Sequence, residues 1–102
     1  MADEFIAQTH PVEISALDSI ASVLVDDGLC VIEREQANEV LLRWNGTPRR
    51  VEWPEDVALR LLEDGVLLTA HTGTKSQIER IIHLAEMALS NELGVPVSFD
   101  DA

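Results

Sequence analysis

The 102-residue chain is poor in cysteine, basic residues and aromatic side chains. Cys30 is the only cysteine, which excludes an intramolecular disulfide and a cysteine-rich metal site and favours a reducing compartment. Only seven Lys and Arg residues stand against 19 Asp and Glu residues, so the formal net charge is -12. This charge repels nucleic acid backbones and anionic membrane surfaces. The charge therefore opposes direct nucleic-acid binding, and a basic protein is the natural partner.

Long apolar runs are also missing. No run approaches the roughly 18 residues that a membrane span requires. The acidic start, MADEFIAQTH, lacks the basic and then apolar pattern of a secretory signal. We therefore expect a cytoplasmic protein with no membrane partner. The hydrophobic content of 46% is that of a globular protein, so we expect one folded domain.

Hydrophobic periodicity between glycine and proline boundaries predicts the elements. Residues 1–10 show no period and are expected to form a flexible arm, and residues 96–102 an acidic tail. The helices are expected over residues 11–27, 54–64 and 75–93. The strands are expected over residues 29–35, 39–44, 49–53 and 66–72. The order α-β-β-β-α-β-α predicts a small α+β domain over residues 11–95, with a mostly antiparallel sheet of about four strands packed by three helices.

Asn45-Gly46 predicts a hairpin between residues 39–44 and 49–53. A four-residue loop, NGTP, would set Val40 beside Trp53 and Leu42 beside Val51. We prefer it to a two-residue loop, which would place like charges directly opposite each other.

The tip of this hairpin is the predicted partner-binding site. Arginine and tryptophan are enriched at binding hot spots, and both gather at the tip of an otherwise acidic chain. The residues are Arg43, Trp44, Arg49 and Arg50. The alternative is that Trp44 and Trp53 are core residues and that the arginines pair with nearby glutamates.

The stretch HTGTKSQ, residues 71–77, resembles a phosphate-binding loop, but its spacing does not match G-x-x-x-x-G-K-[ST]. Thr74 and Gln77 instead predict a capping box at the start of the last helix. Because helix N-termini attract anions, Gly73, Thr74 and Lys75 remain a candidate weak anion site.

No other pattern predicts chemistry. His10, His71 and His83 have no second histidine or cysteine at a metal-ligand spacing, so we expect no metal and no cofactor. The paired carboxylates lie at element ends or in the tail, where capping and solvation explain them: Asp26-Asp27, Glu55-Asp56, Glu63-Asp64 and Asp100-Asp101. We expect a protein that is not an enzyme.

The last predicted helix carries more apolar surface than one core contact needs. Its inward stripe is expected to contain Ile78, Ile81, Ile82, Ala85 and Leu89. Leu84 and Met87 lie beside that stripe and are the candidate interface of a homodimer.

The leading function is therefore a non-enzymatic acidic protein–protein interaction module: an adaptor, a chaperone-like subunit or an inhibitor. The element order and acidity are loosely similar to those of the small acidic chaperones of bacterial secretion systems, although no motif carries that resemblance. One alternative is a nucleic-acid mimic that inhibits a DNA-binding protein. Another is a small ligand-binding domain or enzyme that uses the loop at residues 71–76.

Overall fold

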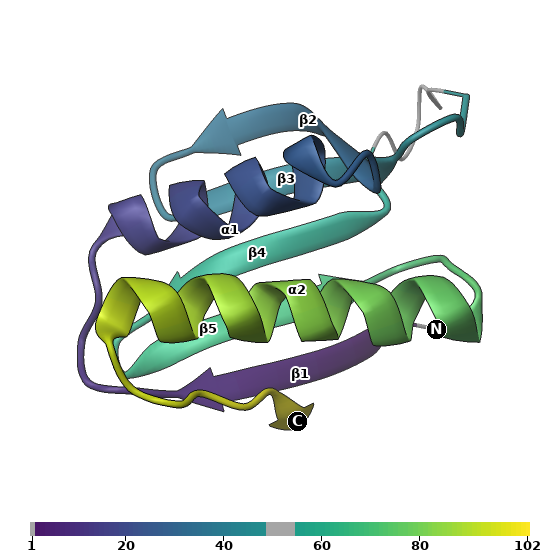
Figure 1. Ribbon diagram of the computed structural model, residues 1–102. Coiled ribbons are helices and arrows are strands. Elements are labelled where there is room, and N and C mark those ends of the chain that lie inside the picture. Colours follow the sequence, from purple (N-terminus) through teal and green to yellow (C-terminus); the bar gives the residue numbers. More distant parts are fainter. Residues whose placement is uncertain (1, 49–54) are drawn as a thin grey trace.

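Two layers make up the computed structural model, which describes residues 2–48 and 55–102 (Figure 1). Over these residues, a six-stranded antiparallel sheet forms one layer and two helices form the other. The elements are β1 (Asp3–Gln8), α1 (Ile14–Asp26), β2 (Cys30–Gln36), β3 (Glu39–Trp44), β4 (Val57–Leu62), β5 (Gly65–Ala70), α2 (Lys75–Leu93) and β6 (Asp100–Asp101).

The strand order in the sheet is β2-β3-β4-β5-β1-β6. Strands β2 to β5 form a meander of consecutive antiparallel strands. Strand β1 pairs with β5 on one side and β6 on the other. Helix α1 carries the chain from β1 to the opposite edge of the sheet and packs beside α2, so both helices lie on one face (Figure 1).

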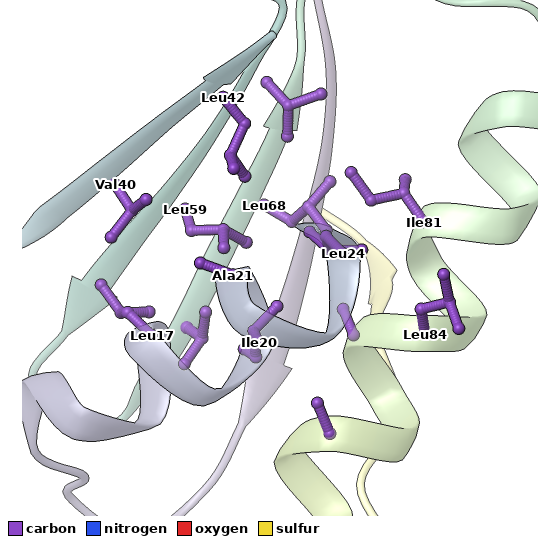
Figure 2. Close-up of a cluster of buried hydrophobic side chains, with 14 of the residues drawn as sticks. Leu17, Ile20, Ala21, Leu24, Val40, Leu42, Leu59, Leu68, Ile81 and Leu84 are labelled. Atoms are coloured by element: carbon purple, nitrogen blue, oxygen red, sulfur yellow. The ribbon is translucent and has the colours of Figure 1, made fainter. Parts of the chain in front are cut away.

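The core lies between the sheet and the two helices. Alternate strand residues point toward the helices, as the two-residue period of a strand requires. Helices α1 and α2 add apolar residues at three- and four-residue spacings, and Figure 2 shows these side chains meeting in one cluster. The fully buried larger residues include Leu17, Ile20, Leu24, Val40, Leu42, Val57, Leu59, Val66, Leu68, Ile81 and Leu89.

Several predicted elements are confirmed with small shifts at their ends. They are the first and last helices, at Ile14–Asp26 and Lys75–Leu93, and three strands, at Cys30–Gln36, Glu39–Trp44 and Gly65–Ala70. The prediction of a small α+β domain with an antiparallel sheet is also confirmed, but the predicted four strands and three helices are wrong.

The flexible arm expected over residues 1–10 is one correction, because Asp3–Gln8 form β1. Strand β1 pairs with β5 along its whole length, from Asp3 opposite Ala70 to Gln8 opposite Gly65. Ala7 is completely buried against the helices, and Phe5 packs beside the core on the same face. Pairing with β5, which lies far away in the sequence, thus makes residues 3–8 a strand although they show little hydrophobic periodicity.

The helix expected from Pro54 to Gly65 is the second correction, because Val57–Leu62 form β4. Its core-facing residues alternate along the strand: Val57 and Leu59 are buried and Leu61 packs against the core. A two-residue turn, Glu63 and Asp64, returns the chain into β5. The six-residue segment VALRLL fits both the helical and the strand period, and strand pairing on both sides decides the outcome here.

The predicted return strand at residues 49–53 lies outside the described residues. Its predicted partners pair elsewhere, with Val40 opposite Leu59 and Leu42 opposite Val57. At the other end of the chain, part of the expected acidic tail belongs to the fold. Phe99 is buried, and Asp100–Asp101 add the short strand β6 to the edge of β1.

Candidate interaction surfaces

One face of the sheet is not covered by either helix, and we call it the open sheet face. The strand register identifies its residues, because side chains opposite each other on neighbouring strands share a face. One row contains Arg34, Leu41, Ala58, Thr69 and Glu4, and the next contains Gln36, Glu39, Arg60, Leu67, Ile6 and Asp100. Leu62 follows in β4, opposite Gly65.

The apolar members of the open sheet face lie near its centre. They are Ile6, Leu41, Ala58, Leu62 and Leu67, all partly exposed. Around them the charges nearly balance, since Arg34 and Arg60 stand with Glu4, Glu39 and Asp100. Gln36 donates a hydrogen bond to Glu39 at 2.9 Å. This surface is chemically unlike the rest of this acidic molecule.

The helices form the opposite surface, which we call the acidic helix layer. Only Lys75 and Arg80 are basic there. Its seven acidic residues are Glu13, Asp18, Asp26, Asp27, Glu79, Glu86 and Glu92.

Two polar contacts join the helices across this layer. Arg80 binds both carboxylate oxygens of Asp27, at 2.6 and 3.0 Å, and Ser19 donates to Glu92 at 3.2 Å. The hydrogen bond from Arg80 holds the pKa of Asp27 below its usual value. Glu13 directly precedes α1, Asp18 lies within it and Asp26 is its last residue. All three side chains are exposed.

The predicted hairpin site is rearranged around a buried carboxylate. Asp56 is completely buried and accepts hydrogen bonds from the backbone N–H of Trp44 at 2.9 Å and from the Thr72 hydroxyl at 2.8 Å. Its own N–H donates to Leu42, and its carbonyl accepts from the N–H of His71. Asp56 therefore ties together the ends of β3, β4 and β5. This role has no local sequence signal, and residues 55 and 56 were expected in the first turn of a helix.

Trp44 belongs to the core, as the alternative interpretation of the hairpin held. It is 3% exposed, and its indole N–H lies 3.2 Å from both the carbonyl and the hydroxyl oxygen of Thr72. Arg43 pairs with Glu33 at 3.2 Å and also donates to the carbonyl of Thr47. Arg49 and Arg50 lie outside the described residues, so half of the predicted partner-binding group is not placed.

Cys30 lies close to the same carboxylate. Burial raises the pKa of its thiol to about 12, and the negative charge of Asp56 adds to the effect. A thiol with this pKa stays protonated at neutral pH and is a poor nucleophile. With 1% exposure, Cys30 is a small buried residue of the core.

The predicted capping box at the start of α2 is confirmed. The N–H of Gln77 donates to the Thr74 hydroxyl at 3.1 Å, and the Gln77 side chain accepts from the N–H of Thr74 at 2.8 Å. Gly73 has φ +130°, and a Cβ atom there would lie 2.8 Å from the Trp44 ring. The Lys75 amine lies 3.9 Å from Glu79. Thr74 and Lys75 thus have partners within their own helix, and the weak anion site stays a prediction.

The predicted dimer residues on α2 have different environments. Leu84 is only 7% exposed and points into the core, so its placement outside the buried stripe is wrong (Figure 2). The stripe is wider than predicted because α2 packs against both the sheet and α1. Met87 is 47% exposed on the outer side of the helix.

A groove of about 700 Å³ opens at the end of the molecule opposite the 71–77 loop. His10 and Asp64 face it, together with the apolar residues Leu93 and Val95 near the end of α2. His71 and His83 lie elsewhere, on the 71–77 loop and on α2. Across the described ranges, no three His, Cys, Asp or Glu residues gather closely enough to hold a metal ion. Over the same ranges, no helix has the length and apolar character to cross a membrane.

Comparison with family models, curated proteins and solved structures gave no match. The surfaces are therefore interpreted from their own geometry and charge.

Proposed function

We propose that the protein is a non-enzymatic interaction module that presents its acidic helix layer to a basic surface of another protein. An adaptor, a chaperone-like subunit and an inhibitor are the three forms that this activity can take. The observation that carries the proposal is the segregation of charge. The helix layer holds seven acidic and two basic residues, whereas the open sheet face is nearly balanced.

The position of these charges favours recognition. Glu13, Asp18 and Asp26 are exposed at the start, within and at the end of α1, so one partner surface that lies along this helix can contact all three. Exposed charges of one sign steer a complementary protein and speed its association, at a rate that falls with ionic strength. The contacts of Arg80 with Asp27 and of Ser19 with Glu92 hold the two helices in a fixed relation. A rigid acidic layer loses little conformational entropy on binding.

The buried polar groups support the same proposal. Both oxygens of Asp56 accept hydrogen bonds from groups that belong to the fold, and the raised pKa of Cys30 keeps its thiol protonated. These contacts are consistent with structural roles for Asp56 and Cys30, and the proposal assigns neither residue a role in catalysis.

The test compares two triple variants with the same change in charge. One neutralises α1 by Glu13→Gln, Asp18→Asn and Asp26→Asn. The control neutralises exposed acids outside the helix layer by Glu35→Gln, Glu63→Gln and Asp64→Asn. Each purified protein is used to capture proteins from a lysate of the source organism, and the affinity for each captured protein is then measured by titration at two salt concentrations.

We expect a basic protein whose affinity falls roughly 10-fold for the α1 variant, because three exposed charge contacts contribute about 0.5 kcal/mol each. The control should bind like the original chain. Equal binding by both variants, or no captured protein, would contradict the proposal. If the partner also binds DNA and duplex DNA competes with the protein for it, the activity is the nucleic-acid-mimicking form of an inhibitor.

A further inference from the structure

We infer that the open sheet face is a self-association surface, through which two copies of this chain pack sheet against sheet about a two-fold axis parallel to the strands. This inference goes beyond the proposed function, because it concerns the face opposite the acidic helix layer. It also differs from the dimer predicted through Leu84 and Met87, since Leu84 is buried within a single copy.

The pattern of apolar residues on the open sheet face is the first observation. An antiparallel sheet with one face in water normally alternates apolar residues inward with polar residues outward. Strand β4 breaks that rule at Ala58 and Leu62, and its neighbours break it at Leu41 and Leu67. In β1, Ile6 lies directly opposite Leu67. These five residues lie on four adjacent strands and form an apolar centre, within which Arg60 stands between Ala58 and Leu62 of β4.

Their arrangement fits a second layer. Leu41 is paired with Ala58 in register, and Leu62 stands opposite Gly65, which has no side chain. Small and large residues thus adjoin, as they do where two packed sheets interdigitate. Burying a partly exposed leucine or isoleucine removes apolar surface from water, which stabilises association by about 25 cal/mol per Å².

The distribution of charge favours a second copy of this chain as the partner of the open sheet face. With a net charge of -12, two copies repel each other in most orientations. The open sheet face is the exception. Its half formed by β2, β3 and β4 carries Arg34 and Arg60 against Glu39, besides the paired Arg43 and Glu33.

The other half of the face, formed by β5, β1 and β6, carries Glu4 and Asp100 and no basic residue. The two halves are therefore of opposite sign. A two-fold axis along the strands, between β4 and β5, places each half over the opposite half of the other copy. Such an isologous contact is self-complementary in charge.

The size of the face sets the strength of the expected dimer. Six strands at about 4.8 Å spacing and six residues at about 3.3 Å give a footprint of roughly 500 Å² per copy. The total of about 1,000 Å² is at the lower limit for specific interfaces. We therefore expect a reversible dimer with a dissociation constant in the micromolar range.

The experiment measures molar mass by sedimentation equilibrium from about 5 to 500 µM, a range that brackets micromolar affinity. The interface variant is Leu67→Lys, and the matched control is Met87→Lys, which places the same charge on an exposed apolar site of α2. Circular dichroism and urea unfolding check that each variant is folded. We expect dimers for the original chain and for Met87→Lys, with dissociation at least 10-fold easier for Leu67→Lys.

A second set of variants tests the charge arrangement with all five apolar residues kept. Arg60→Glu should weaken the dimer, because it makes the half formed by β2, β3 and β4 negative, like the half of the other copy that lies over it. Adding Glu4→Arg and Asp100→Arg to the same chain should restore the affinity to within about 3-fold, since the other half then carries two positive charges and the halves are again opposite in sign.

Three results would overturn the inference: a monomer at every concentration, a dimer insensitive to both Leu67→Lys and Arg60→Glu, or a dimer lost in Met87→Lys but kept in Leu67→Lys. Partner capture by the α1 variants has a separate readout. Failure of the sheet dimer would therefore leave the proposed function standing, and failure of partner capture would leave the dimer standing.

Discussion

Asp56 shows how one polar residue can hold three strand ends together. Its carboxylate accepts from the Trp44 N–H and the Thr72 hydroxyl, and its backbone bonds to Leu42 and His71. The Trp44 indole then bonds to Thr72 as well, so the interactions form one connected network. A buried carboxylate is stable only when its hydrogen-bonding capacity is met, which these donors achieve.

The Asp56→Ala variant should lose about 2–4 kcal/mol of folding free energy, because it leaves a buried backbone N–H and a hydroxyl without their acceptor. Urea unfolding followed by tryptophan fluorescence measures this loss. The exposed Asp18→Ala variant is the control and should change stability by about 0.5 kcal/mol or less. A loss below 1 kcal/mol for Asp56→Ala would show that the network is not a major source of stability.

Single residues also show where sequence reasoning fails. The placement of Leu84 depended on how wide a stripe α2 buries, and that width is set by α1, which lies beside it in space. The burial of Asp56 depended on the ends of β3 and β5 lying on either side of it, where Trp44 and Thr72 donate to its carboxylate. Neither fact has a local signal, whereas the capping box of Thr74 and Gln77 has one and was predicted correctly.

Whole helices and strands also differ in whether their sequence alone encodes them or contacts with distant segments decide them. Helix α2 was predicted from Lys75 to Leu93 because its start, its period and its end at Gly94 are all encoded within the segment. Strand β4 was predicted as a helix because VALRLL fits both periods, and pairing with β3 and β5 decides between them. Strand β1 was missed because its order comes from β5, which is remote in the sequence.

The contact between β1 and β5 is close enough to test with one methyl group. Gly65 lies opposite Gln8, and a Cβ atom at Gly65 would stand 2.1 Å from the carbonyl oxygen of Ala7. Because that oxygen belongs to the backbone, β1 has to move away from β5 to make room. We expect Gly65→Ala to destabilise the fold by roughly 2–4 kcal/mol, as other overpacked sites do at the upper end of their range.

Hydrogen exchange of the β1 amides is the measurement specific to this contact, and urea unfolding gives the overall loss. The control is Gly94→Ala, where a Cβ atom has no neighbour within 4 Å and the φ of +73° alone is unfavourable. It should cost about 1 kcal/mol and leave the exchange of β1 unchanged. Unchanged protection of β1 in Gly65→Ala would contradict the expectation.

For the molecule as a whole, the excess of negative charge opposes compactness. A net charge of -12 repels itself in the folded state more than in the expanded unfolded chain. Salt screens this repulsion, since the Debye length falls from about 30 Å at 0.01 M to about 10 Å at 0.1 M.

We therefore expect the thermal midpoint to rise by a few degrees between about 0.01 and 0.2 M NaCl. Differential scanning calorimetry at constant pH and protein concentration measures the change. The variant with Glu13→Gln, Asp18→Asn and Asp26→Asn should show a smaller rise, because it carries less charge to screen. A midpoint that falls with salt would mean that attractive ion pairs, such as Asp27 with Arg80, outweigh the general repulsion.

The position of β1 in the sheet has a consequence for the order in which the protein is made. Residues 3–8 are synthesised before the rest of this sheet, and their partner strand, Gly65–Ala70, follows about 60 residues later. At about 5–20 residues per second, this delay lasts roughly 3–12 s. During that time Phe5 and Ile6 have no sheet to join, while the meander from β2 onward can assemble from neighbouring segments. Completion of the sheet therefore waits until β5 has been synthesised and β1 can pair with it.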